Sequence, residues 1–211
     1  VAARDVADLL GVPLSWSDAT RTATLGSAGG TTCVPDVAAP AFILVDVATG
    51  AVLSEHNART PRAIASTTKI MTALLAVEQG DPDAVVTVSW NAANQPGTSV
   101  YLRSGEQRTL RELLYGLMLV SGNDAAVAIA EHLAGSEEAF AQRMNWRAAE
   151  LGAHDTYFVT SSGLDDWVDP YSTAEDLAII SLAGLHNPLF RSYMYPPQWT
   201  IPGPFGNRLL T

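Results

Sequence analysis

The sequence is 211 residues long, 47% hydrophobic and 16% charged, which is enough to bury one sizeable core. Its formal net charge is −10 and it contains no cluster of arginines, so nucleic acid is not an expected partner. The single cysteine, Cys33, excludes an intrachain disulfide, and the four histidines lack metal-ligand spacing, so we expect no metal and no cofactor.

The first 26 residues, VAARDVADLLGVPLSWSDATRTATLG, predict a small module. Val6, Leu9 and Leu10 share one face of a short helix, and strand-like runs at 14–16 and 21–25 flank a turn. This stretch resembles the end of the repeat found in copper amine oxidase N-terminal-like domains, a resemblance that implies no catalytic copper. The small and polar residues that follow predict a linker over 27–39.

We expect the main domain to span residues 40–211. Its first segment, AFILVDVATGAVLSE (41–55), predicts an antiparallel hairpin that turns at Ala48-Thr49-Gly50. A short strand is expected at 85–89, whereas the proline-rich stretch that begins at Pro196 gives no clear prediction. The chain starts without methionine, and we expect it to be a processed or truncated product.

Helical spacing of apolar residues predicts five helices, at 66–79, 109–120, 124–135, 136–152 and 172–184. Ser136 is the expected N-cap of the fourth helix and Gly152 its end, while Ser172-Thr-Ala-Glu175 has the pattern of a capping box. Two strands make a poor sheet for so many amphipathic helices. We therefore expect an α/β fold of the α+β type, an antiparallel sheet flanked by helices, whose later strands lie beyond Thr211.

Lys69 is the only lysine in the sequence, and Ser66 stands three residues before it. Side chains at i and i+3 of a helix can touch. Serine needs a base to remove its proton, and burial at a helix N-terminus lets lysine act as that base because it disfavours the ammonium form. The alternative is a capping serine beside a solvated lysine, but the uncharged run around Lys69 predicts burial instead.

The tripeptide Ser121-Gly122-Asn123 separates two strongly apolar helices. A loop at this point could bring the Ser121 hydroxyl and the Asn123 carboxamide to the rim of a cleft. Ser121 could then relay a proton between Lys69 and a leaving group, and Asn123 could bind a substrate amide. Taken alone, the same residues are also typical of an ordinary helix break and cap.

Together, Ser66-x-x-Lys69 and Ser121-x-Asn123 match two of the three motifs shared by class A β-lactamases and penicillin-binding proteins. The blocks PRAIASTTKIMTALLAVE, TLRELLYGLMLVSGNDAAVAIAEHLAGSEEAF, MNWRAAELGAHDTYFVTSSGLDD and YSTAEDLA also occur in the order typical of one family. From about Pro40 to Thr211, the chain resembles the serine-type D-Ala-D-Ala carboxypeptidases, the low-molecular-weight penicillin-binding proteins of the S11 peptidase type.

The resemblance implies a DD-peptidase/serine β-lactamase-like fold and a role for each motif residue. Ser66 is the implied nucleophile, Lys69 its general base, Ser121 a proton relay and Asn123 a substrate-amide ligand, with the Ser66 N–H in the oxyanion hole. The implied partners are peptidoglycan stem peptides ending in D-Ala-D-Ala and β-lactam antibiotics. The implied location is secreted or in the bacterial cell envelope, with peripheral membrane or cell-wall association through segments outside this chain.

The sequence also departs from the family pattern. The family usually has asparagine within the block written here FVTSSGL, and histidine where Pro170 precedes Tyr171. Its third motif, K-T-G, needs a lysine, and Lys69 is the only one, so we expect an incomplete active site. Two alternatives remain open: a catalytically incomplete penicillin-binding-like recognition module and a serine β-lactamase, for which no deacylating Glu-x-x-Leu-Asn element is found.

Overall fold

The computed structural model describes residues 14–17, 22–25, 37–164, 170–202 and 207–210. The chain divides into two compact units, residues 1–58 and 59–211. The predicted helix around Val6 and most of the predicted linker lie outside the described residues. The limits predicted for the module, the linker and the main domain therefore remain predictions.

The described strands of the first unit form two antiparallel pairs. Strand β1 (Leu14–Ser17) pairs with β2 (Thr22–Leu25), and β3 (Phe42–Val45) pairs with β4 (Val52–His56). Both pairs were predicted from strand-like runs on either side of a turn. In the second turn, the Asp46 carboxylate accepts hydrogen bonds from the Thr49 backbone N–H and hydroxyl, which fixes the hairpin.

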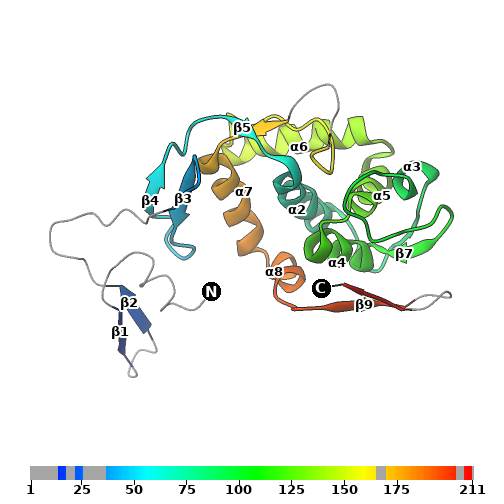
Figure 1. Cartoon of the computed structure of the whole chain (residues 1–211), viewed down its shortest axis with the longest axis horizontal. Helices are drawn as coiled ribbons and strands as arrows, with labels where there is room; N and C mark the ends of the chain where they lie inside the picture. Colours follow the sequence, from blue (N-terminus) through cyan, green and yellow to red (C-terminus); the bar gives the residue numbers. More distant parts are fainter. Residues whose placement is uncertain (1–13, 18–21, 26–36, 165–169, 203–206, 211) are drawn as a thin grey trace. The chain divides into compact units, whose positions relative to one another are not determined.

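Helix α2 (Lys69–Gln79) is the central element of the second unit. It follows a 3₁₀ turn, η1 (Ala65–Thr68), and contacts α4 (Leu110–Val120), α5 (Asn123–Ala134) and α7 (Ala174–His186). Figure 1 shows α2 between α7 on one side and the α4–α5 pair on the other. Because every residue from Met71 to Ala76 is buried, α2 is a core helix rather than an amphipathic surface helix.

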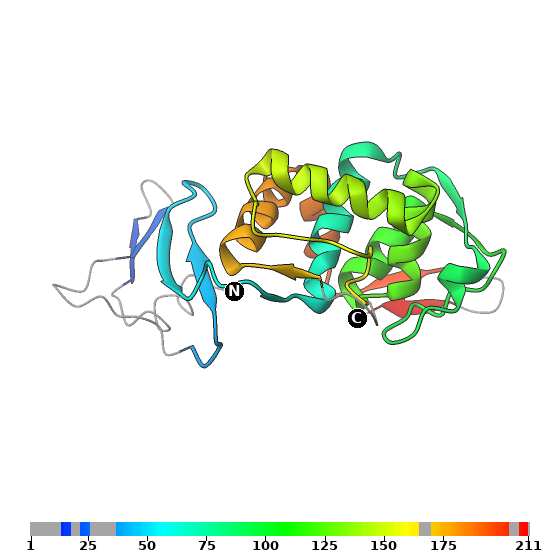
Figure 2. The ribbon, with the colours of Figure 1, turned by 90° about the horizontal axis from the view of Figure 1, so that it is seen from above.

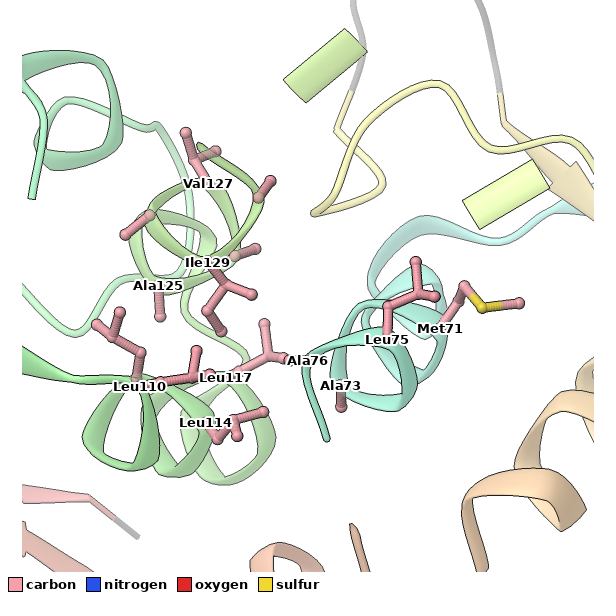
Figure 3. Close-up of a cluster of buried hydrophobic side chains, with 14 of the residues drawn as sticks. Met71, Ala73, Leu75, Ala76, Leu110, Leu114, Leu117, Ala125, Val127 and Ile129 are labelled. Atoms are coloured by element: carbon pink, nitrogen blue, oxygen red, sulfur yellow. The ribbon is translucent and has the colours of Figure 1, made fainter. Parts of the chain in front are cut away.

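The apolar side chains of these helices meet in one cluster. Figure 3 shows Leu114 and Leu117 of α4, Ile129 of α5 and Ala76 of α2 pointing toward one another. All four are at most 1% exposed. Complete burial of a leucine or isoleucine side chain contributes about 1.5–3 kcal/mol, so this cluster anchors α2, α4 and α5. Lys69 and Asn123 begin α2 and α5, Ser66 lies in the turn before α2, and Ser121 follows α4.

Helix α6 (Glu137–Leu151) lies alongside α5 and α7 (Figure 2). Its predicted cap is confirmed, since the Ser136 side chain accepts a hydrogen bond from the Ala139 N–H, and Gly152 ends it in the left-handed conformation. The predicted capping box at 172–175 was wrong by one residue. Thr173 caps α7 by accepting from the Asp176 N–H, because Ser172 is already taken up by a strand.

The remaining elements of the second unit are short. Strands β5 (Arg62–Ala63) and β8 (Tyr171–Ser172), β6 (Val85–Thr87) and β7 (Gln107–Thr109), and β9 (Trp199–Ile201) and β10 (Arg208–Leu210) form three antiparallel pairs. Two short helices, α3 (Trp90–Ala93) and α8 (Pro188–Met194), complete it. Helices with antiparallel strands confirm the α+β class, although the described strands form separate pairs rather than one sheet. The β9–β10 pair was not predicted.

No helix within the described ranges is long and apolar enough to cross a membrane.

Candidate active site

Ser66 and Lys69 lie at the junction of η1 and α2, and their side chains touch. The Lys69 Nζ is 2.9 Å from the Ser66 Oγ, and it also donates to the Ser162 carbonyl oxygen at 3.0 Å. Lys69 is only 3% exposed, whereas Ser66 is exposed. The hydroxyl is thus open to a substrate while the amine beneath it is shielded from water, as expected for a nucleophile and its base.

Burial lowers the pKa of the Lys69 ammonium from 10.5 to about 8. In the part of the chain that the structure describes, no carboxylate forms an ion pair with Lys69 that would oppose this shift. A substantial fraction of neutral amine is therefore present near pH 8, and a neutral amine can take the Ser66 proton.

The turn that carries Ser66 has a strained backbone. Ala65 has a φ of +42°, which is unusual for a residue with a Cβ atom, and Thr67 closes the turn by donating its N–H and its hydroxyl to the Ile64 carbonyl oxygen. Strain of this kind persists only where the surroundings hold the backbone in place. It is consistent with a nucleophile fixed in position before substrate arrives.

The segment Ser161-Ser162-Gly163 supplies those surroundings. The Ser161 and Ser162 carbonyl oxygens accept hydrogen bonds from the Thr72 hydroxyl (2.6 Å) and the Lys69 Nζ. Gly163, at φ +82°, packs against the Ala65 carbonyl oxygen so closely that a Cβ atom would not fit. This role of the segment could not be predicted from the sequence, because it acts through backbone carbonyls that every residue type possesses.

Ser121 ends α4 in the left-handed conformation, with φ +58°, and its carbonyl oxygen accepts a hydrogen bond from the Thr98 hydroxyl at 2.6 Å. Among the hydrogen bonds of the described residues, none joins the Ser121 hydroxyl to Ser66 or Lys69. The predicted relay role of Ser121 therefore remains a prediction.

Asn123 begins α5 and is 2% exposed. Its Nδ2 donates to the Pro96 carbonyl oxygen at 2.7 Å and its backbone N–H to the Thr98 carbonyl oxygen at 2.8 Å. Its Oδ1 is a buried acceptor that has no hydrogen-bond partner in the structure. Buried polar atoms are nearly always paired, so the Asn123 carboxamide retains hydrogen-bonding capacity that the protein itself does not use.

Gly97 lies close to Asn123 and to Leu164. A Cβ atom on Gly97 would come within 2.8 Å of the Asn123 Nδ2 and 3.7 Å of the Leu164 side chain, one residue beyond the segment that holds Lys69.

The described residues contain no group of three or more histidine, cysteine, aspartate or glutamate side chains able to hold a metal ion. The chemistry that this arrangement supports is acylation of Ser66 with Lys69 as base.

The sequence is similar to one family of known proteins. The family model for D-alanyl-D-alanine carboxypeptidase matches residues 29–198. The sequence is 41% identical to DacF of Bacillus subtilis (strain 168) over 148 residues, 68% of this chain and 38% of that protein. It is 35% identical to DacB2 of Mycobacterium tuberculosis H37Rv over 182 residues, 86% of this chain and 62% of that protein. Both relatives are D-alanyl-D-alanine carboxypeptidases.

Solved structures agree with these relatives. A crystal structure of a D-alanyl-D-alanine carboxypeptidase from Mycobacterium tuberculosis H37Rv superposes with a TM-score of 0.82 at 34% identity, covering 87% of this chain and 69% of that one. The S216A mutant of the Streptomyces K15 DD-transpeptidase superposes with a TM-score of 0.76 at 33% identity, covering 84% of this chain and 74% of that one. The chain spans 38% and 62% of the lengths of the two curated relatives above.

Proposed function

The chain belongs to the D-alanyl-D-alanine carboxypeptidase family, the S11 peptidases, and from this premise we propose that it carries the acylation machinery of a serine D-Ala-D-Ala carboxypeptidase. The proposed substrate is a peptidoglycan stem peptide that ends in D-Ala-D-Ala. One observation carries the proposal: the exposed Ser66 hydroxyl lies 2.9 Å from the amine of a buried lysine whose pKa is lowered to about 8.

The proposed reaction begins with proton transfer from the Ser66 hydroxyl to the neutral Lys69 amine. The Ser66 oxygen attacks the carbonyl carbon between the two D-alanines, and the Ser66 backbone N–H stabilises the oxyanion that develops. The proton then passes to the nitrogen of the leaving D-alanine, with Ser121 as the proposed relay. Water hydrolyses the resulting ester and regenerates the Ser66 hydroxyl.

Asn123 has a binding role in this proposal. Its carboxamide, with one Nδ2 hydrogen on the Pro96 carbonyl, is suited to hydrogen-bond a backbone amide of the peptide. The same groups would accept a β-lactam, in which attack by Ser66 opens a strained cyclic amide. Substrates of this class place the protein outside the cytoplasm, secreted or in the bacterial cell envelope, and membrane or cell-wall association would come from segments outside this chain.

Release of D-alanine from diacetyl-L-Lys-D-Ala-D-Ala tests the proposal. The gene product that contains this chain should release D-alanine, and Ser66→Ala should abolish the release. Ser136→Ala is the matched control, because it removes an α6 cap at a cost of about 1 kcal/mol of stability and leaves the nucleophile intact. Undiminished release by Ser66→Ala would refute the assignment of the nucleophile.

A further inference from the structure

Asp124, the residue after Asn123, is completely buried, and its carboxylate is saturated with hydrogen bonds. Its two oxygens accept from the Ser99 hydroxyl (2.7 Å), the Val100 N–H (2.9 Å), the Leu102 N–H (2.9 Å) and the Ala125 N–H (2.9 Å). A buried carboxylate is costly unless it is paired in this way. None of the steps proposed above uses this group, so its place beside Asn123 needs another explanation.

The donors to Asp124 come mainly from one loop, residues 96–102. Val100 packs against Gly116 and Gly122, where a Cβ atom would come closer to the valine side chain than real contacts allow. Tyr101 has a φ of +61° and is 80% exposed, although Val100 and Leu102 on either side of it are buried. A tyrosine in this conformation costs of order 1–3 kcal/mol, which the three hydrogen bonds from the loop to Asp124 help to offset.

The start of the same loop fixes the Asn123 side chain. The Pro96 carbonyl oxygen accepts from the Asn123 Nδ2, and the Thr98 carbonyl oxygen accepts from the Asn123 N–H. The Pro96 carbonyl accepts one of the two Nδ2 hydrogens, and the Oδ1 has no hydrogen-bond partner in the structure. The orientation of the Asn123 carboxamide is therefore fixed by a loop whose other end is held by Asp124.

We propose that Asp124 is a positioning residue, which holds the loop 96–102 so that the Asn123 carboxamide is oriented to hydrogen-bond an amide of the substrate. This inference rests on the proposed function, in which Asn123 binds that amide. Asp124 itself touches no reacting atom. Its effect is on reagents that engage Asn123 and not on the reactivity of Ser66 as such.

Two reagents distinguish binding through Asn123 from the reactivity of Ser66 in the gene product that contains this chain. A fluorescent penicillin carries a side-chain amide for Asn123, whereas phenylmethanesulfonyl fluoride reacts with an activated serine and carries no amide. Asp124→Asn places an NH₂ group against N–H donors, so penicillin acylation should fall about 10-fold or more while the sulfonyl fluoride rate stays within about threefold. Asn123→Ala should change the ratio of the two rates in the same direction.

A milder variant and a matched control complete the design. Ser99→Ala removes one donor to Asp124 and should change the ratio in the same direction by a smaller factor. Asp176 is a buried carboxylate that accepts from the Asp155 N–H and the Thr156 hydroxyl, away from the loop. Asp176→Asn should lower the unfolding midpoint and leave the ratio unchanged.

Hydrogen exchange at the Val100 and Leu102 amides provides a readout independent of chemistry, and both should exchange faster in Asp124→Asn. An unchanged ratio in Asp124→Asn and Ser99→Ala, with normal acylation of the wild type, would overturn this inference alone. A folded wild type that reacts with neither reagent would overturn the proposed function and this inference with it.

Discussion

At the scale of single residues, the account depends on the only lysine of the chain. Arginine remains protonated at any usable pH, so a chain with eleven arginines still needs lysine where a base is required. The sequence predicted a buried amine beside Ser66, and the structure confirms it with 3% exposure and a contact of 2.9 Å. In the proposed reaction, the exposed serine is the nucleophile and the buried lysine is its base.

The lowered pKa of Lys69 predicts the pH dependence of acylation. The neutral amine is the active form, and its fraction increases as the pH rises through the pKa of about 8 rather than 10.5. The rate of penicillin acylation should therefore rise between pH 6 and pH 9 and then level off. Stopped-flow measurement over this range gives the profile. A rate independent of pH, or an inflection near 10.5, would contradict the role of Lys69.

Substitution of the lysine tests the same role directly. Lys69→Arg keeps a positive charge but cannot accept the proton, so acylation should fall by about 100-fold or more. The fluorescence of a penicillin-labelled band over time measures this loss. Near-wild-type labelling of a folded Lys69→Arg protein would show that another group removes the Ser66 proton.

At the scale of elements, the nucleophile turn depends on close contact with the segment around Gly163. Gly163 and Gly135 both have a φ of +82°, but only Gly163 faces a neighbour, the Ala65 carbonyl oxygen. Alanine at either position adds backbone strain of about 1 kcal/mol. Gly163→Ala should in addition displace the Ser66 turn and slow acylation on the order of 10- to 100-fold.

Gly135→Ala is the control for that comparison, because it has the same conformation with nothing within 4 Å of the added Cβ atom. It should lower stability slightly and leave acylation unchanged. Equal acylation rates in the two variants would mean that the contact between Gly163 and Ala65 does not position Ser66.

A second link between elements joins β7 to the C-terminal strand pair. The Glu106 carboxylate accepts hydrogen bonds from Arg108 of β7 and Arg208 of β10. Burial alone would raise the pKa of Glu106, but the hydrogen bonds from Arg208, the Arg103 N–H and Arg108 outweigh it and lower this pKa to about 2. Stabilisation from a lowered carboxyl pKa is present above the unfolded value of 4.5 and is lost as the pH falls toward 2.

Glu106→Gln should therefore lower the free energy of unfolding at pH 7 by about 2 kcal/mol, and the difference from wild type should shrink below pH 4.5. Urea unfolding at several pH values measures this. Glu175→Gln is the control, because its partner Arg59 is 75% exposed and such a surface pair contributes roughly 0.5 kcal/mol or less. A difference that is constant with pH would contradict the role of the Glu106 charge.

At the scale of the whole molecule, the features that the sequence predicted well are those set by residues close together in the chain. Helix α6 was found from its apolar spacing, Ser136 and Gly152, and the Ser66–Lys69 contact follows from a separation of three residues. The α+β class and the family followed from several such blocks in order. The caps of α6 and the Ser66–Lys69 contact are each determined within one or two turns of chain.

Contacts between distant segments could not be predicted in this way. The Ser162 carbonyl that meets Lys69 is 93 residues away from it, and the Pro96 carbonyl that meets Asn123 is 27 residues away. Backbone carbonyls have no signature in the sequence, so neither contact had a local signal. The β9–β10 pair was missed because prolines at 202 and 204 obscure its short strands.

The most direct test of the account is the position of a penicillin adduct. Trypsin cleaves after Arg62 and Lys69, which releases the peptide 63–69 with Ser66 as its only serine. Mass spectrometry of the gene product treated with benzylpenicillin should find this peptide heavier by one antibiotic molecule, with the adduct on Ser66. An adduct on any other residue, or none on the folded protein, would contradict the central claim that Ser66 is the nucleophile.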